Sequence, residues 1–364
     1  MRPSVIALVV LTFGAGSLEG QLSDSVSPPQ QYDLSTDGQA FLLREAANAS
    51  FFMLGELHGE NEIPSLIRGL WPSMWKAGYR HVAAEISPWA ANRLESGRSD
   101  PPIFGLWRAS EAAFVTSPKT DRRRVLWGCD IEEIQPQWLI RELAAANPKD
   151  RHLQAAVDAV GDTYRRRMAP ILLQHLQSAT VAKDLIINNV SLRGHLIRTL
   201  EVEADRSAGT ALQASTRRER VMKDLFHDYW RTAAGKPKVF LRFGRNHLHR
   251  GYDRRGVSTL GNFVAELAVA EHLQVFNVAA FAGGGKIALT GPPSDFDERG
   301  DDPAFAYLAS IARYPATVFD LRPMRQALHR VPESKRSALE TSLVYWVDSY
   351  DAMLFYREVT PLGY

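Results

Sequence analysis

Short apolar runs alternate with amphipathic segments along most of this 364-residue chain. The apolar runs have the length and composition of strands, and they span residues 50–54, 81–85, 125–130, 239–244, 274–281, 317–321 and 352–358. Helical spacing of apolar residues is clearest in the segments 62–76, 88–95, 260–271 and 339–347. Strands that alternate with helices form parallel crossover units. The sequence therefore predicts an α/β fold, with a central, mostly parallel sheet flanked by helices.

The strand signal disappears between the third and the fourth predicted strands. Apolar residues in this part of the chain instead recur at helical spacing, in two groups: Leu153, Val157 and Val160, and Leu192, Leu196 and Leu200. We therefore predict an all-helical insertion at residues 136–236, which is a candidate lid.

The composition suits a single large domain. Hydrophobic residues make up 45% of the chain, which is enough for a sizeable buried core. We expect one α/β domain over residues 38–364. The formal net charge is +2, from 43 basic and 41 acidic residues. A nucleic-acid partner requires a concentrated basic face, so no nucleic acid is expected as a partner.

The amino terminus has the features of a secretory signal peptide. A basic start is followed by the almost wholly apolar residues 5–13 and by small residues at 14–17. We expect residues 1–17 to be removed on export, with a retained anchor as the alternative. Residues 18–37, rich in Ser, Pro and Gln, are expected to form a flexible lead-in.

Export places the mature protein in the bacterial periplasm or outside the cell, with no transmembrane helix after signal removal. Cys129 is the only cysteine, so no intrachain disulfide forms. A core large enough to need no disulfide agrees with this location.

Ionisable residues occur where four of the predicted strands end. Glu56 and His58 follow the first strand, Glu85 ends the second, Asp130 ends the third and His247 follows the fourth. Because the carboxyl ends of parallel strands share one edge of a sheet, we expect these side chains to meet in one crevice. Each of them has a structural alternative, as a helix cap or a hydrogen-bonded core residue. Four such strand ends together favour a functional site.

These residues suit a reaction that activates water. Glu56 and His58 are two positions apart, so an extended chain points both to the same side. A carboxylate beside an imidazole orients the ring and raises its basicity, as a general base requires. Glu85 is expected to accept from the other ring nitrogen or to position the water. Arg68, on the following helix, is a candidate to neutralise a developing oxyanion.

The same side chains also suit a metal ion, because two histidines with carboxylates are a reasonable ligand set for zinc, manganese or iron. The candidate ligands are His58, Glu56, Glu85, Asp130 and His247. The paired histidines of helical zinc proteases are absent from the sequence.

Other motifs narrow the chemistry further. Residues 256–261 miss the serine nucleophile motif by one position, and Cys129 is expected to be a buried apolar side chain. Glu60 and Glu62 fit the first turn of the following helix, where carboxylates favour the helix dipole. Activated water is therefore favoured over a covalent intermediate.

This pattern resembles the erythromycin esterase-like superfamily, which also includes haem-binding ChaN-type lipoproteins and TIKI-type metalloproteases. The spacing of Glu56 and His58 is nearer to that of the ChaN and TIKI branches than to that of the esterases. The motifs that carry the resemblance are LGELHG at 54–59 with Glu62, VAAE at 82–85, WGCD at 127–130, RRERVM at 217–222, GRNH at 244–247, LGN at 260–262 and the segment 350–361.

The resemblance implies that His58 is a general base supported by Glu56 and Glu85, with Arg68 and His247 on the substrate side. It implies an exported hydrolase of an ester, lactone or amide bond, which acts on a small molecule or a peptide and requires no cofactor. Two alternatives come with it: a periplasmic iron- or haem-binding protein of the ChaN type, and a protease of the TIKI type that uses a divalent metal.

Overall fold

Eight strands form one mixed sheet in the computed structural model, which describes residues 22–98, 107–118, 124–289 and 291–362. The strands from β12 to β4 run parallel, whereas β11 runs antiparallel to both of its neighbours. The predicted α/β fold with a mostly parallel sheet is confirmed, and each predicted strand overlaps an observed one. From one edge to the other, the order is β1 (Gln30–Asp33), β11 (Ala316–Asp320), β12 (Ala352–Tyr356), β8 (Val275–Ala282), β2 (Phe51–Glu56), β7 (Lys238–Gly244), β3 (Tyr79–Ala84) and β4 (Leu126–Gly128).

Helices cover both faces of the sheet, so the central strands are apolar on both sides. In β2, Phe52 and Leu54 belong to one hydrophobic core, whereas Phe51 and Met53 belong to the other. The first core includes α1 (Asp37–Asn48), α2 (Glu62–Lys76), α3 (Pro88–Glu95) and α4 (Ala109–Thr116). The second core includes α10 (Leu260–Ala270), α11 (Pro303–Ile311), α12 (Arg322–Arg330) and α13 (Ala338–Ser349).

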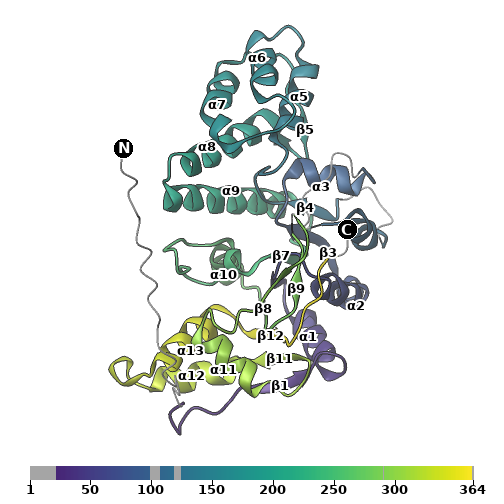
Figure 1. The fold of residues 1–364 in the computed structure, drawn as a ribbon. Helices are drawn as coiled ribbons and strands as arrows, with labels where there is room; N and C mark the ends of the chain where they lie inside the picture. Colours follow the sequence, from purple (N-terminus) through teal and green to yellow (C-terminus); the bar gives the residue numbers. More distant parts are fainter. Residues whose placement is uncertain (1–21, 99–106, 119–123, 290, 363–364) are drawn as a thin grey trace, which may run out of the picture.

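The predicted helical insertion between β4 and β7 is also present, and it extends from one end of the sheet (Figure 1). It contains a short hairpin of β5 (Ile186–Ile187) and β6 (Val190–Ser191) that the sequence pattern did not indicate. Its helices are α5 (Pro136–Ala146), α6 (Arg151–Val160), η1 (Arg166–Met168), α7 (Ala169–Ser178), α8 (Leu192–Ser207) and α9 (Ala211–Thr232).

The last helix of the insertion, α9, packs on the sheet itself. Its residues Met222 and Phe226 join the second core together with Trp127 of β4 and Phe51 of β2. The ring centroids of Phe51 and Phe226 are 5.8 Å apart. This packing carries the amino-terminal half of α9 to the end of β4.

Short elements complete the described fold. A 3-10 turn, η2 (Arg245–His247), follows β7 directly, and another, η3 (Glu333–Lys335), precedes α13. A two-stranded sheet pairs β9 (Lys286–Ile287) with β10 (Ser294–Asp295).

The lead-in expected to be flexible is instead bonded to the domain over its described part. Gln30–Asp33 forms the edge strand β1, which pairs with β11, and Tyr32 stacks on Phe41 at a centroid distance of 4.5 Å. Ser23 donates from its backbone nitrogen to Glu340 at 2.9 Å. The prediction failed because the four-residue strand is polar, and polar composition alone does not distinguish an edge strand from a linker.

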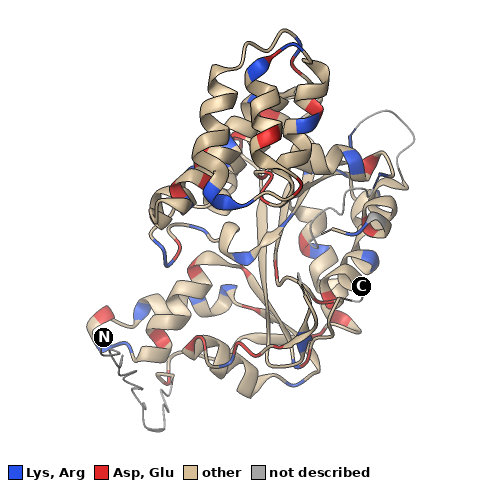
Figure 2. Ribbon diagram, turned by 45° about the horizontal axis from the view of Figure 1, so that its top comes forward, with Lys and Arg blue, Asp and Glu red and all other residues tan. Residues whose placement is uncertain are grey.

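The predicted signal peptide, residues 1–17, lies outside the described residues. Within the described ranges, no helix is both long and apolar enough to cross a bilayer. Acidic and basic residues are interspersed along the ribbon (Figure 2).

Candidate active site

The carboxyl ends of β2, β7, β3 and β4 lie side by side because these four strands are parallel neighbours. Glu56 is the last residue of β2 and pairs with Gly244 at the end of β7. Glu85 directly follows β3, and Asp130 lies two residues beyond β4. The structure thus brings together Glu56, His58, Glu85, Asp130 and His247, at the edge where ligands bind in such sheets.

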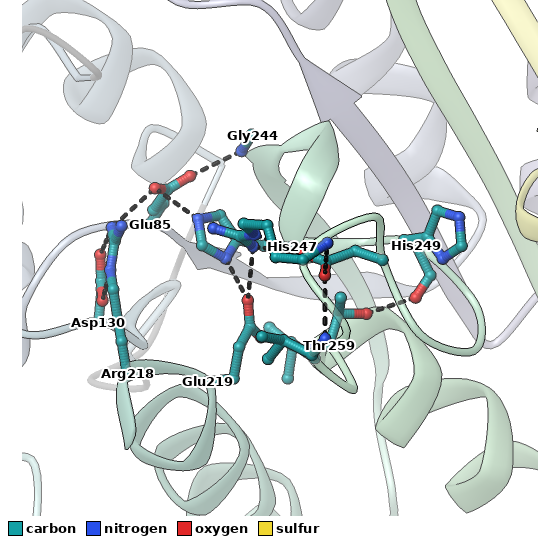
Figure 3. A network of polar contacts seen from close by, with 12 residues as sticks. Glu85, Asp130, Arg218, Glu219, Gly244, His247, His249 and Thr259 are labelled. Carbon is teal, nitrogen blue, oxygen red and sulfur yellow. Dashed lines mark hydrogen bonds and ion pairs between the residues drawn. The ribbon is translucent and has the colours of Figure 1, made fainter. Parts of the chain in front are cut away.

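Glu85 is bonded to groups from three other elements of the fold (Figure 3). Its Oε2 accepts from the backbone nitrogen of Gly244 at 2.7 Å, and its Oε1 accepts from Arg218 Nη2 at 2.8 Å. The Nε2 atom of His247 lies 3.2 Å from the same Oε1. Burial by itself raises the pKa of Glu85, but the charges of His247 and Arg218 outweigh burial and hold that pKa well below its ordinary value. Glu85 is therefore ionised at neutral pH.

Asp130 fixes the arginine that contacts Glu85. Arg218 projects from α9, and its Nε donates to Asp130 Oδ1 at 3.0 Å while Nη2 donates to Asp130 Oδ2. Its Nη2 also reaches Glu85, so one guanidinium joins the ends of β3 and β4 (Figure 3). A planar guanidinium can bond two carboxylates at once, which an ammonium does less well.

His247 lies between two carboxylates. Its Nδ1 donates to Glu219 Oε1 at 2.5 Å, while its Nε2 faces Glu85 (Figure 3). The other oxygen of Glu219 accepts from the backbone nitrogen of Leu260, at the start of α10, at 2.8 Å. Burial alone lowers the pKa of His247, but the two carboxylates raise it to about 10. At neutral pH His247 is an imidazolium with both nitrogens engaged, so it cannot accept a proton.

His58 is the imidazole that solvent reaches. Its side chain is 30% exposed, against 9% for His247. Its Nδ1 lies 3.8 Å from Glu56 Oε1, and its Nε2 lies 3.7 Å from Glu85 Oε2. Burial lowers the pKa of His58 from its ordinary value, although the charge of Glu85 acts in the opposite direction. His58 is therefore neutral at physiological pH and able to take up a proton.

A second arginine lies behind His58. Arg242, within β7, donates from Nε to Glu56 Oε2 at 2.6 Å and from Nη1 to Glu111 Oε1 at 2.9 Å. Its guanidinium also stacks 4.6 Å from the ring centroid of Trp107. Burial raises the pKa of Glu56 to about 8, with Arg242 opposing the shift. Arg242 thus fixes one oxygen of Glu56 and leaves the other facing His58.

Gly244 is required where the ring of His58 passes over β7. A Cβ atom at this position would lie 2.7 Å from His58 Nε2 and 3.2 Å from Glu85 Oε2. The first distance is shorter than the contacts that Cβ atoms make in proteins, and the second is tight. Any side chain at residue 244 would therefore displace His58 from Glu85.

Two expectations from the sequence are wrong. Arg68 is exposed on α2 and makes no hydrogen bond or ion pair with the site residues that the structure describes, because its helix turns this position toward solvent. Glu60 does not lie in the first helical turn, since α2 begins at Glu62. Glu60 is instead buried, and it lines a small cavity beside His58.

Sequence reasoning did not assign roles to Arg218, Glu219 and Arg242, although each carries a recognisable signal. Arg218 and Glu219 precede Met222 by four and three positions, so they continue the apolar face of α9. Arg242 interrupts an otherwise apolar strand. A charge on a surface that the pattern predicts to be buried indicates a paired or functional group.

The side chains do not suit a metal ion. Among the described residues, no group of three or more His, Cys, Asp or Glu side chains is arranged to hold one. Arg218 binds Asp130 and Glu85, and His247 has Glu219 at its Nδ1 and Glu85 at its Nε2. An axial haem ligand needs a ring nitrogen that faces an apolar cavity, and both nitrogens of His58 face carboxylates.

A wider hollow of about 260 Å³ begins at η2, directly before His247 in the chain. Its charged walls are largely paired, because Arg254 binds Asp302 and Arg255 binds Asp253. A larger hollow, of about 540 Å³, lies in the insertion, between α5 and α6, and none of the strand-end residues lines it. The hollow at η2 is lined by Arg245, Asn246, Asp253, Arg254, Arg255, Asp301, Asp302, Phe305, Tyr345 and Trp346.

Cys129 takes no part in this site. Its side chain is fully buried, and burial raises the pKa of the thiol well above its ordinary value. A protonated, buried thiol is a poor nucleophile, as the sequence led us to expect.

Comparison with solved structures identifies the fold. An erythromycin esterase mutant, EreC in its open conformation, superposes with a TM-score of 0.58 over 89% of this chain and 94% of that chain, at 15% identity. A protein from Bacillus cereus gives 0.57 over 92% and 95%, at 12% identity. A succinoglycan biosynthesis protein gives 0.60 over 93% and 96%, also at 12% identity. No protein-family model matches the sequence, and no curated protein matches it significantly.

The chain therefore has the fold of an erythromycin esterase over most of its length, as the motifs in the sequence predict. At such low identity the superpositions establish the fold, and the activity has to be argued from the site.

The charge state of His247 can be measured directly. We expect ¹⁵N NMR of the imidazole rings to show His247 with both nitrogens protonated at pH 8, because its pKa is raised to about 10. Glu219→Gln removes one of the two carboxylates and should lower that pKa. The pKa of His247 in the folded protein lies above 6.5, the ordinary value of a histidine that is taken for the unfolded chain. The contribution of His247 to the free energy of unfolding is therefore complete below pH 6.5 and declines as the pH rises toward 10. A neutral His247 ring at pH 8 in the wild type would contradict this assignment.

Proposed function

We propose that this protein is a hydrolase that cleaves an ester, lactone or amide bond with water activated by His58. The observation that carries the proposal is the environment of His58, a neutral and partly exposed imidazole held between Glu56 and an ionised Glu85. A general base needs a free lone pair, access to solvent and a neighbour that stabilises the positive charge it acquires.

The attacking water is placed beside His58 Nε2 and Glu85 Oε2. The Nε2 and Oε2 atoms are 3.7 Å apart, so a water molecule beside both can point one hydrogen at the ring and the other at the carboxylate. His58 takes the first proton as the water attacks the carbonyl carbon. Glu85 stabilises the resulting imidazolium, which then protonates the leaving oxygen or nitrogen.

His247 and Arg218 act on this reaction through Glu85. Their positive charges keep the carboxylate ionised, and their hydrogen bonds keep it fixed. A preorganised carboxylate does not have to reorient when the imidazolium forms, which lowers the barrier. Asp130 and Glu219 in turn hold Arg218 and His247.

The hollow at η2, of about 260 Å³, is the proposed binding site for the substrate. It is lined by Arg245 and Asn246, which directly precede His247 in the chain, and Arg255 Nη2 lies 4.0 Å from Glu219 Oε1, the partner of that histidine. A small molecule or a peptide is therefore the proposed substrate. The fold shared with an erythromycin esterase, a hydrolase by name, supports the same reaction class.

We include export in the proposal, because residues 1–17 have the composition of a signal peptide. Amino-terminal sequencing of the protein recovered from the periplasm or the culture medium tests this point. A mature chain that begins at Met1 in the cytoplasm would disprove it.

Replacement of His58 tests the reaction itself. We expect His58→Gln to lower the hydrolysis of an active substrate, found with a panel of esters, lactones and amides, by roughly 10²- to 10⁴-fold, because the general base is lost. His329→Gln, at an exposed histidine paired with Asp348, is the matched control and should retain full activity.

The pH profile gives a second criterion for His58. Because His58 must be deprotonated to act, kcat/KM should rise with pH through a pKa below 6.5 and then stay level. It should fall near pH 10, where His247 loses its proton and with it the charge that holds Glu85. Full activity of His58→Gln on every substrate hydrolysed by the wild type would refute the proposal.

Gly244→Ala tests the geometry without removing a functional group. The backbone at this position has φ −51° and ψ 136°, which alanine adopts freely, so the variant should fold. Its Cβ would displace the His58 ring, and we expect activity to fall about a hundredfold with an unchanged Tm. Gly300→Ala is the control, since a Cβ there meets no atom within 4 Å. Equal activity of the two variants would show that the position of the His58 ring over Gly244 does not matter.

A further inference from the structure

Three buried polar atoms, one of His58 and two of nearby glutamates, have no hydrogen-bond partner among the described residues: His58 Nδ1, Glu56 Oε1 and Glu60 Oε2. Unpaired buried polar atoms are uncommon in folded proteins, and each needs an explanation. Two of them, Nδ1 of His58 and Oε1 of Glu56, are 3.8 Å apart, which is too far for a direct hydrogen bond. All three residues line the same small space.

That space is a cavity matched in size to one water molecule. The centre of a water molecule can move within about 10 Å³ of this cavity. This volume is near the minimum that one buried water requires. The cavity is lined by Glu56, Leu57, His58, Gly59, Glu60, Pro64, Arg242 and Leu362. A buried water typically makes about three hydrogen bonds to protein groups that would otherwise lack a partner.

We propose that this cavity is a binding site for one structural water, and that Glu60 is a positioning residue that acts on His58 through it. The water accepts from His58 Nδ1–H and donates to Glu56 Oε1 and Glu60 Oε2, so it uses both of its hydrogens and one of its two lone pairs. The proton of His58 is then held on Nδ1, and Nε2 keeps its lone pair on the side of Glu85. This inference rests on the proposed role of His58 only for its effect on catalysis.

The proposed water offsets the effect of burial on the two carboxyls. Burial raises the pKa of Glu56 to about 8 and that of Glu60 to about 7. Hydrogen bonds donated by a water favour the ionised form of each carboxyl and oppose this shift.

Glu60 is held in place by the carboxyl-terminal segment. It forms an isolated antiparallel bridge with Pro361. On either side of it, Leu362 N donates to Gly59 O at 2.8 Å and Asn61 N donates to Thr360 O at 3.0 Å. The Glu60 side chain is therefore positioned by a segment far away in sequence, and its residue is 2% exposed.

The first test is a crystal structure of the protein at about 1.5 Å resolution. We expect one water peak within hydrogen-bond distance, roughly 3.2 Å, of all three atoms. An empty cavity would overturn the proposal. A stronger peak with contacts near 2.1 Å would also overturn it, because such distances indicate a bound metal ion.

The second test measures the tautomer of His58 by ¹⁵N NMR in the full-length protein. The His58 ring of the wild type should be protonated mainly on Nδ1. Glu60→Leu should lower the ratio of the Nδ1-protonated to the Nε2-protonated tautomer at least threefold. Glu60→Gln keeps an oxygen that accepts from the water and should restore the wild-type ratio. Glu358→Leu, at an exposed glutamate of the same terminal segment, controls for the loss of charge.

An unchanged tautomer ratio in a folded Glu60→Leu protein would refute the role of Glu60. If Glu60→Leu does not fold, the ratio in Glu60→Gln and the crystal structure decide the question. The wrong tautomer of a catalytic histidine is costly, so activity should fall roughly tenfold or more in Glu60→Leu. The tautomer is measured without substrate, so loss of the proposed hydrolase activity would not affect this result.

Discussion

The negative charge of the buried Glu85 carboxylate requires positively charged and hydrogen-bonding partners. The arrangement of the strand ends follows from this requirement. A charge removed from water is tolerated only when it is paired and hydrogen-bonded, and loss of one partner of such a pair costs about 3–5 kcal/mol. Glu85 obtains its partners from α9, from η2 and from the backbone at the end of β7. The same interactions that stabilise one anion therefore hold separate elements together and fix the imidazole of His58.

Two histidines beside this carboxylate have opposite protonation states. His247 is enclosed by two carboxylates and is held as a cation, whereas His58 lacks a close ion pair and burial favours its neutral form. The difference lies in the distances to the carboxylates, since burial lowers the pKa of both rings. His247 lies 3.2 Å from Glu85 and 2.5 Å from Glu219, whereas Nε2 of His58 is 3.7 Å from Glu85. Environments that separate the pKa values of like groups are a common way to assign different roles in one site.

The helical insertion supplies part of the site, although the sequence pattern suggested only a lid. Arg218 and Glu219 lie on α9, where Arg218 is partly buried and Glu219 is buried because the apolar face of that helix packs against the sheet. The periodicity of α9 was readable in the sequence, so a search for charges on its apolar face finds both residues. The position of Arg68 could not be predicted from the sequence. A helical pattern does not indicate which loops the helix approaches.

The sequence by itself determined the α/β class, the parallel strands and the set of strand ends, because apolar periodicity and strand order depend on local composition. It also determined that Glu56, His58, Glu85, Asp130 and His247 meet, since parallel strands end at one edge. Only the tertiary structure decided which imidazole is neutral and which side chains are paired. Those properties depend on distances and burial between segments remote in sequence, such as α9 against β3 and the carboxyl terminus against the loop after β2.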